Sequence, residues 1–207
     1  MGTQTVADRY RQTCQRPFWQ QVLAFETDYL RQYLSRQDTI LSIGCGPALI
    51  EQALARQGFS LTGLDIAAEA LASVPPSVPT VLAPAEALPF DAEQFDVVLF
   101  LVSLQFVNNP QQAIAEAARV LRPAGRLIVL LLNPASAFYK TRVATAGSYV
   151  QRIRHPDPVT LQTRIAQDFR VQAEYLLGIA EERVFPSSDP AEAAIYALRG
   201  HKRRPGG

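Results

Sequence analysis

The chain of 207 residues is 48% apolar, and its 20 basic and 19 acidic residues leave a formal net charge of +1. This length and composition predict one globular domain over residues 1–200, and the balanced charge gives no field that would favour nucleic acid as a partner. The two cysteines suggest no disulfide framework and the apolar runs are too short to span a bilayer, so we expect a cytoplasmic protein without a membrane partner. The oligomeric state stays open.

Residues 1–36 are predicted to form an N-terminal helical cap. Apolar and aromatic residues recur there at the spacing of one or two amphipathic helices, namely at Phe18, Val22, Phe25, Tyr29, Leu30 and Leu34. These residues are expected to pack the cap onto a sheet. Tyr10, Trp19 and Glu26 are the polar or amphipathic side chains that the cap offers to a binding site.

Residues 39–65 contain the strongest pattern of the chain. A strand over 40–43 leads into Gly44-Cys45-Gly46, and a helix over 47–57 and a strand over 60–64 follow, ending at Asp65. Strand, glycine turn, helix, strand and acid make half of a nucleotide-binding α/β unit. A carboxylate at the end of the second strand can accept both hydroxyls of a ribose, so the pattern predicts a site for an adenosine-containing ligand.

The details of the glycine turn narrow the choice of ligand. Leu49 stands where a dinucleotide-binding fingerprint needs its third glycine, which disfavours a nicotinamide-dependent oxidoreductase. The turn also lacks the Lys followed by Ser or Thr that a phosphate-binding P-loop requires. A pyrophosphate or triphosphate ligand is therefore poorly supported.

The rest of the chain alternates further helices and strands. A strand over 96–101 is apolar on both faces, as in a central parallel strand, and its carboxyl end should face the ligand. The other expected helices are 67–73, 111–121, 136–142 and 159–168, and the other expected strands are 80–83, 127–132, 169–179 and 193–198. Residues 201–207 are expected to form a disordered basic tail.

Several motifs in order resemble one family. Besides the glycine turn, they are the segments 83–90 (APAEALPF), 102–110 and 119–127 (RVLRPAGRL). Together they resemble class I S-adenosylmethionine-dependent methyltransferases, in the methyltransferase type 11-like branch. The resemblance implies an α/β, doubly wound, mostly parallel seven-stranded sheet with helices on both faces and an antiparallel last strand. It also implies S-adenosyl-L-methionine as cofactor and a small-molecule methyl acceptor, with residues 133–158 as a candidate substrate-side insertion.

The resemblance assigns roles to residues of the cofactor site. Gly44, Cys45, Gly46 and Pro47 would line the methionine side, and Asp65 would hold the ribose. Ile66 and Ala85 would border the adenine, Glu86 is a candidate reader of its amino group, and Phe100 would end the fourth strand beside the cofactor.

Three positions depart from the family pattern. Ser42 replaces an acid that helps to hold the cofactor's ammonium group, and Pro84 replaces the adenine-reading acid. Ala48 replaces a third glycine, which we expect to be tolerated if its φ is negative. These departures leave a second hypothesis open, in which the chain keeps the fold as a non-catalytic ligand-binding or interaction protein.

Few side chains are candidates for a general base. His155 is the default candidate, although a surface histidine is the plainer interpretation, and Tyr10, Tyr139 and Tyr149 are alternatives. Arg152 and Arg154 are either solvated or hold an acidic substrate. Cys45 is interpreted as a small residue beside the ligand rather than as a nucleophile, and no residue spacing predicts a metal site.

Overall fold

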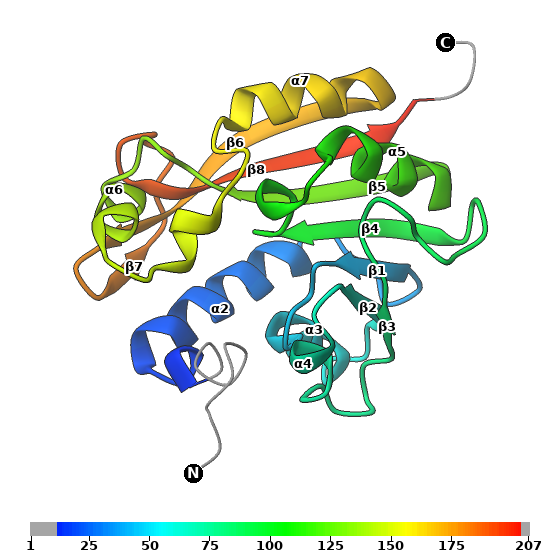
Figure 1. Cartoon of the computed structure of the whole chain (residues 1–207), viewed down its shortest axis with the longest axis horizontal. Helices are drawn as coiled ribbons and strands as arrows, with labels where there is room; N and C mark the ends of the chain where they lie inside the picture. Colours follow the sequence, from blue (N-terminus) through cyan, green and yellow to red (C-terminus); the bar gives the residue numbers. More distant parts are fainter. Residues whose placement is uncertain (1–11, 204–207) are drawn as a thin grey trace.

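The computed structural model describes residues 12–203, which form a sheet covered by helices on both faces (Figure 1). The sheet has eight strands in the order β3-β2-β1-β4-β5-β8-β6-β7. The strands from β3 to β5 in this order are parallel, whereas β8 is antiparallel to β5 and to β6. The bounds are β1 (Thr39–Ile43), β2 (Ser60–Asp65), β3 (Thr80–Leu82), β4 (Phe95–Leu101), β5 (Leu121–Leu132), β6 (Phe169–Ala180), β7 (Arg183–Phe185) and β8 (Ala193–Lys202).

The predicted strand count of seven is wrong by one. The additional strand is β7, which forms a short hairpin with the end of β6 through the pairs Gly178↔Phe185, Ile179↔Val184 and Ala180↔Arg183. Three residues are too few to show the alternation by which a strand is recognised in a sequence. The rest of the predicted architecture, a mostly parallel sheet with an antiparallel last strand, is confirmed.

Helices cover the two faces of the sheet separately. α2 and α3 pack on one face, and α5 and α7 pack on the other (Figure 1). The helical bounds are α2 (Pro17–Arg31), α3 (Leu49–Ala55), α4 (Ala68–Leu71), α5 (Pro110–Val120), α6 (Ala137–Ala144) and α7 (Pro158–Asp168), with two 3₁₀ turns, η1 (Leu104–Phe106) and η2 (Tyr149–Arg152).

The packing of strand β4 explains why its sequence is apolar on both faces. Successive side chains of a strand point to opposite faces. Val97 and Leu99 accordingly pack with α2 and α3, whereas Val98 and Phe100 pack with α5 and α7. Because both faces are covered, every position in the middle of the strand is buried and no polar alternation appears.

The last strand extends into the predicted tail. β8 continues to Lys202, with His201 paired to Arg126 of β5 and Arg170 of β6, and Lys202 Nζ donates a hydrogen bond to the Leu121 carbonyl. The expectation of disorder from residue 201 onward is therefore wrong for His201 and Lys202. Backbone pairing on both sides holds this end of the strand, although its residues are polar.

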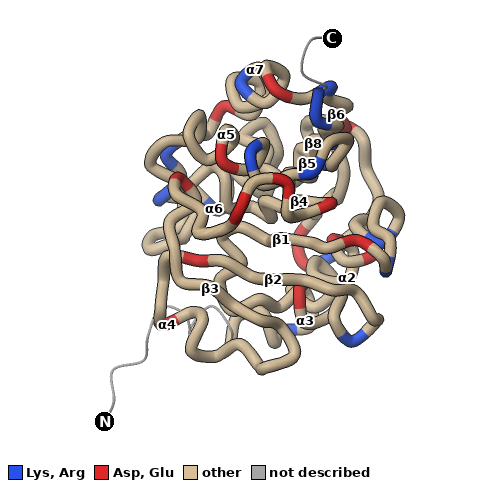
Figure 2. The backbone as a smooth tube through the Cα atoms, turned by 90° about the vertical axis from the view of Figure 1, so that its right-hand side faces the viewer, with Lys and Arg blue, Asp and Glu red and all other residues tan. Residues whose placement is uncertain are grey.

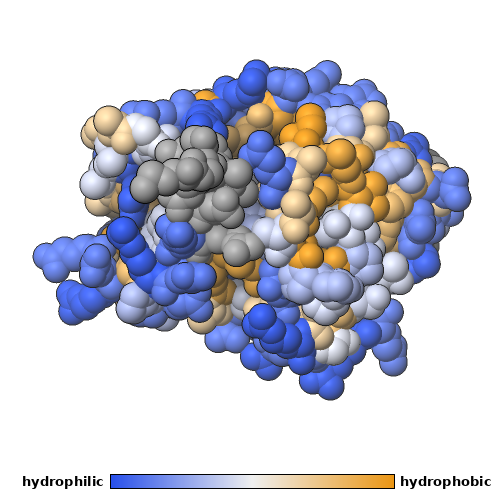
Figure 3. Space-filling view, turned by 60° about the horizontal axis from the view of Figure 1, so that its bottom comes forward, coloured by the Kyte–Doolittle hydropathy of each residue, from blue (hydrophilic) through white to orange (hydrophobic). Residues whose placement is uncertain are grey.

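The surface of the described residues carries charges of both signs. Lys and Arg are interspersed with Asp and Glu along the chain (Figure 2). One face also shows a region in which apolar residues gather, with hydrophilic residues around it (Figure 3). Among the helices of residues 12–203, none combines the length and the apolar character needed to cross a membrane.

Candidate functional site

Two adjoining cavities lie beyond the carboxyl ends of the parallel strands. The first, of about 420 Å³, is bordered by the glycine turn, α2, α3, the end of β4 and the segments that follow β5. The second, of about 460 Å³, lies between the end of β2, the loop after β3 and η1. Both are lined by Gly44, Asp65, Val102 and Phe106, so together they form one elongated site.

The glycine turn is held tightly against the end of β4. The N–H groups of Gly44 and Cys45 donate to the Leu64 carbonyl at 2.7 and 3.0 Å, and Ser103 Oγ donates to the Ile43 carbonyl at 2.6 Å. Gly44 has a φ of +73°, and a Cβ atom built on it would lie 2.4 Å from Ser103 Cβ. Only glycine satisfies both the backbone conformation and this close approach.

Asp65 lies where the sequence predicts a ribose-binding acid. Its Oδ2 accepts a hydrogen bond from the Gly46 N–H and its Oδ1 accepts one from the Ala67 N–H, both at 2.8 Å. Each carboxylate oxygen can accept a further hydrogen bond. The carboxylate is therefore fixed in orientation and still able to bind two hydroxyl groups.

The second cavity collects the residues assigned to adenine. Ile66, Pro84, Ala85 and Glu86 all line it, and the Ile66 side chain is 68% exposed. Glu86 Oε1 accepts hydrogen bonds from the N–H groups of Asn108 and Asn109 at 2.9 and 3.0 Å. The Glu86 carboxylate is thus one wall of the cavity and also fastens the start of α5.

Ser42 does not line either cavity, but its hydroxyl is hydrogen-bonded to Glu51, an acid that lines the first cavity. The Ser42 hydroxyl is buried in β1 and donates a hydrogen bond of 2.6 Å to Glu51 Oε1. Glu51 lies in the first turn of α3, lines the first cavity and is 2% exposed. Burial raises the pKa of Glu51 to about 6, although the hydrogen bond from Ser42 opposes the shift. An acid nine residues after position 42 is thus hydrogen-bonded to Ser42 and borders the first cavity.

The condition of a negative φ at Ala48 is not met. Ala48 is fully buried and adopts a left-handed conformation with a φ of +54°, and α3 begins only after it, at Leu49. Such a conformation is uncommon for a residue with a Cβ atom. The glycine turn therefore extends through Ala48, and the predicted helix start at Pro47 is two residues too early.

Cys45 fits the interpretation of a small residue beside the ligand. A Cβ atom built on Gly63 would lie 2.8 Å from Cys45 Sγ, so the sulfur packs closely over the backbone of β2. Burial raises the pKa of the Cys45 thiol, and the carboxylates of Glu51 and Asp65 raise it further. The thiol therefore stays protonated and is a poor nucleophile.

The assignment of Phe100 to the cofactor site is wrong. Its side chain is fully buried among residues packed with α5 and α7, and it lines neither cavity. The neighbouring residues Leu101 and Val102 line the first cavity instead. A strand turns successive side chains to opposite faces, so an error of one residue moves the side chain to the other side of the sheet.

The structure does not bring His155 into the site. Its ring Nε2 lies 3.1 Å from the Val107 carbonyl oxygen, and the residue lines neither cavity. Tyr139 is likewise absent from both linings, and Tyr10 lies outside the described residues. Among the predicted tyrosines only Tyr149 lines the first cavity, and burial raises the pKa of its phenol, so it stays protonated.

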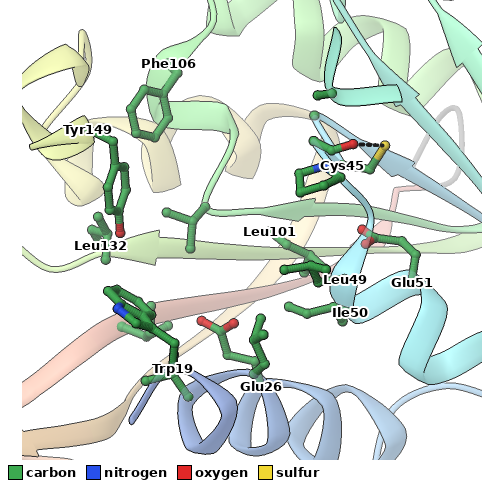
Figure 4. A pocket seen from close by; sticks show the side chains of 18 of the residues that line it. Trp19, Glu26, Cys45, Leu49, Ile50, Glu51, Leu101, Phe106, Leu132 and Tyr149 are labelled. Carbon is green, nitrogen blue, oxygen red and sulfur yellow. Dashed lines mark hydrogen bonds between the residues drawn. The ribbon is translucent and has the colours of Figure 1, made fainter. Parts of the chain in front are cut away.

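The first cavity has an aromatic and apolar end. Trp19 and Glu26 project into it from α2, opposite Phe106 and Tyr149, whose rings stack with centroids 6.3 Å apart (Figure 4). Burial and the nearby Glu51 carboxylate raise the pKa of Glu26 to about 8. The remaining wall at this end is apolar and consists of Leu132, Phe138, Leu177, Ile179, Ala194 and Ile195.

Acidic side chains dominate the charged lining of this cavity. Within the described part of the chain, four carboxylates and one guanidinium line it, namely Glu26, Glu51, Asp65, Glu69 and Arg152. Arg154 lines the second cavity. Residues 12–203 contain no group of three His, Cys, Asp or Glu side chains placed to hold a metal ion. The site therefore suits a ligand that carries positive charge.

The sequence matches proteins that carry a methyltransferase domain. Residues 41–129 match the family model described as a methyltransferase domain. The chain is 30% identical over 115 residues to a ubiquinone biosynthesis O-methyltransferase of Coxiella burnetii, covering 49% of each chain. It is 31% identical over 122 residues to a protein of the same name from Xanthomonas oryzae pv. oryzae, covering 55% of this chain and 51% of the relative. The chain spans about half the length of the curated relatives it matches.

Solved structures share the fold over most of the chain. A Thermotoga maritima protein described as a SAM-dependent methyltransferase, possible histamine N-methyltransferase, superposes with a TM-score of 0.80 at 20% identity, covering 96% of each chain. A SAM-dependent methyltransferase from Archaeoglobus fulgidus superposes with a TM-score of 0.69 at 16% identity, covering 87% of this chain and 94% of the other. The predicted resemblance and the predicted fold are confirmed by these matches.

Proposed function

We propose that this chain, which carries a methyltransferase domain over residues 41–129 within the class I methyltransferase fold, transfers a methyl group from S-adenosylmethionine to a small-molecule acceptor. The observation that carries the proposal is the position of Asp65. The glycine turn fixes its carboxylate at the junction of the two cavities. The second cavity is bordered by Ile66 and Ala85, and the first cavity has the aromatic end. A ribose there would place an adenine on one side and a reactive group on the other.

The residues present fit this cofactor. Asp65 would accept the ribose hydroxyls, Ile66 and Ala85 would border the adenine, and Gly44 to Pro47 would line the methionine portion. Glu51 takes the place of the acid missing at position 42 and would hold the ammonium group. Four carboxylates against one guanidinium in the lining suit a ligand with a positive sulfur and an ammonium group.

The cofactor supplies a methyl group that its positively charged sulfur already activates. The protein then mainly has to align the acceptor and keep water away. The apolar wall and the aromatic rings of Trp19, Phe106 and Tyr149 serve both purposes. The size of the cavity supports a small acceptor, and the names of the curated relatives favour oxygen as the methylated atom.

Titration calorimetry with S-adenosylmethionine, S-adenosylhomocysteine and NADH tests the cofactor assignment. We expect micromolar binding of the first two and none of NADH. Asp65→Ala should weaken binding about 10- to 100-fold, because a charge-assisted hydrogen bond contributes about 1.5–3 kcal/mol. Asp91→Ala is the matched control. Asp91 is exposed and lies in the turn that precedes β4, at the amino end of this strand, whereas the cavities lie at its carboxyl end.

Two results would contradict this assignment. Equal affinity in Asp65→Ala would remove the ribose role of Asp65, and Asp65→Asn, which keeps one acceptor oxygen, shows whether loss of binding reflects a distorted turn. Failure of the unmodified protein to bind either sulfur compound would reject the proposed function. In that case the non-catalytic protein suggested by Pro84 becomes the better hypothesis.

A further inference from the structure

Glu26 is a largely buried acid that meets the first cavity. The residue is only 6% exposed, and among residues 12–203 no group donates a hydrogen bond to its carboxylate or forms an ion pair with it. Because no buried side-chain oxygen of these residues lacks a hydrogen-bond partner, the carboxylate oxygens of Glu26 are open to the cavity. Three other acids of the site accept hydrogen bonds, Glu51 from Ser42, Asp65 from two N–H groups and Glu86 from two more, whereas Glu69 is exposed to solvent. Burying an unpaired carboxylate is costly, so stability does not explain its presence.

The position of Glu26 places it between the two ends of the first cavity. Trp19, Leu23 and Glu26 follow one another along the face of α2 that lines the cavity. The Glu26 carboxylate points into the cavity, with Trp19 and Tyr149 toward one end and the glycine turn and Glu51 toward the other (Figure 4). A molecule at the aromatic end would therefore lie beside Glu26 and face the glycine turn.

The lining at the aromatic end limits the chemistry of that molecule. Rings of Trp19, Phe106 and Tyr149 come from three different elements and suit a flat aromatic body. The carboxylate of Glu51, and that of Glu26 once it is ionised, disfavour an anionic acceptor, which argues against the acidic substrate considered from Arg152 and Arg154. A cationic amine would place a second positive charge next to the activated sulfur, and its nitrogen lone pair would be blocked by a proton. A neutral hydroxyl has neither disadvantage.

We propose that the acceptor is an aromatic compound with a hydroxyl group and that Glu26 removes the hydroxyl proton during methyl transfer. This inference rests on the proposed function. The acceptor oxygen forms a bond to the methyl carbon as the sulfur–carbon bond breaks and its electron pair stays on sulfur. In the molecules in which Glu26 is ionised, a fraction that grows as the pH approaches 8, the hydroxyl proton moves to a carboxylate oxygen of Glu26 and is later released to solvent, so charge and atoms balance.

The electrostatic surroundings of Glu26 suit this role. Burial comes first and the Glu51 carboxylate second in raising the pKa of Glu26 to about 8. The titratable and charged groups that line the same cavity are Cys45 of the glycine turn, Glu51 of α3, Asp65 at the end of β2, Glu69 of α4, and Tyr149 and Arg152 of η2. A carboxyl whose pKa approaches that of a phenol, about 10, accepts the phenol proton at a smaller energetic cost than an ordinary carboxylate does.

A fluorinated probe tests binding and reaction separately. 4-Fluorophenol and 4-fluorotoluene are titrated into the protein loaded with S-adenosylhomocysteine and followed by ¹⁹F NMR. We expect the phenol to bind at least about tenfold more tightly than the toluene, and Glu26→Leu to abolish most of this preference. With S-adenosylmethionine, 4-fluorophenol should give 4-fluoroanisole, and Glu26→Gln should lower the rate about 100-fold or more.

The control variants separate the possible causes. Glu182→Gln changes an exposed glutamate that lines neither cavity and should leave binding and rate unchanged. Glu26→Asp keeps a carboxylate and should retain more activity than Glu26→Gln if both variants fold as circular dichroism reports. Affinity for S-adenosylhomocysteine, measured by calorimetry, should stay within about threefold in Glu26→Gln, because Glu51 and not Glu26 is assigned to the cofactor.

The outcomes distinguish this inference from the proposed function. If S-adenosylhomocysteine binds but 4-fluorophenol does not, or binds without yielding 4-fluoroanisole, the inference is overturned and the cofactor assignment stands. An unchanged rate in Glu26→Gln overturns the role of Glu26. If neither sulfur compound binds the unmodified protein, the proposed function itself fails.

Discussion

Glu26 and Glu51 lie on different helices and face the same cavity, yet their surroundings differ. Glu51 accepts a hydrogen bond from Ser42, which opposes the effect of burial, and its pKa rises only to about 6. Glu26 has no such donor among the described residues, and its pKa rises to about 8. At neutral pH, Glu51 is therefore mainly charged and Glu26 mainly neutral in the ligand-free protein.

The raised pKa of Glu26 makes a prediction about stability. The folded state holds the proton up to about pH 8, whereas the unfolded chain loses it near the ordinary value of 4.5. Between these values the folded state binds more protons, so the contribution of Glu26 to stability is full below about pH 4.5 and decreases as pH rises toward 8. Relative to the unmodified protein, Glu26→Gln should gain on the order of 2–4 kcal/mol between about pH 5 and pH 9.

Urea denaturation of both proteins at the two pH values measures this difference. All other titrating groups are shared, so their effects cancel in the comparison. A difference between the two proteins that does not change with pH would show that Glu26 titrates as an exposed glutamate.

The positions of site residues could be predicted from the sequence where a motif fixes the backbone, and not where they depend on packing. Asp65 follows the glycine turn at a fixed interval and lines both cavities, and its ribose-binding role stays a prediction. Glu51 was missed, although its place next to Ile50 and Leu54, on the apolar side of the expected helix, was a signal. Phe100 was assigned wrongly because the family pattern locates the end of the strand but does not say to which face of the sheet each side chain points.

At the scale of elements, Gln105 connects η1 to the end of β5. Its side-chain oxygen accepts a hydrogen bond of 2.7 Å from the Leu132 N–H, and its Nε2 donates one of 3.1 Å to the Leu132 carbonyl. Its own carbonyl accepts from the N–H groups of Arg154 and His155. One fully buried residue therefore joins three segments that surround the two cavities.

Gln105→Ala should destabilise the protein by about 2–4 kcal/mol, because the buried N–H and C=O of Leu132 would lose their partners. Gln111→Ala is the matched control, since Gln111 makes only an exposed hydrogen bond to Gln167 and should change stability by less than about 0.5 kcal/mol. Chemical denaturation gives both values. A loss below about 1 kcal/mol in Gln105→Ala would mean that water replaces the amide.

Elements between residues 39 and 132 could be predicted well because their hydrophobic periods are regular and their turns contain glycine or proline. The observed β1, β2 and α5 agree with the predictions to within one residue at each end. Three errors have local causes. The left-handed Ala48 delays the start of α3, and the three-residue β7 is too short to carry a period. β5 begins at Leu121, six residues before the expected strand over 127–132, because Leu121 already pairs with Phe95 ahead of an irregularity in the register.

At the scale of the whole molecule, ligand binding should be visible in thermal stability. A ligand present at 100 times its Kd adds about 2.7 kcal/mol to the free energy of unfolding, which corresponds to about 5–10 °C in Tm for a domain of this size. We expect this shift with S-adenosylhomocysteine and none with NADH. The shift should nearly disappear in Asp65→Ala, and an equal shift with NADH would contradict the proposed cofactor.

The division of the first cavity has a consequence for how this protein can evolve. The matched segment, residues 41–129, supplies the glycine turn, Glu51 and Asp65. Most of the aromatic and apolar end comes from outside that segment, from α2, from residues after β5 and from the antiparallel β8, whose first residues reach the same edge of the sheet. Mutations can therefore remodel the acceptor end while the cofactor end is kept, so that new substrate preferences arise by drift in segments where sequence similarity is lost first.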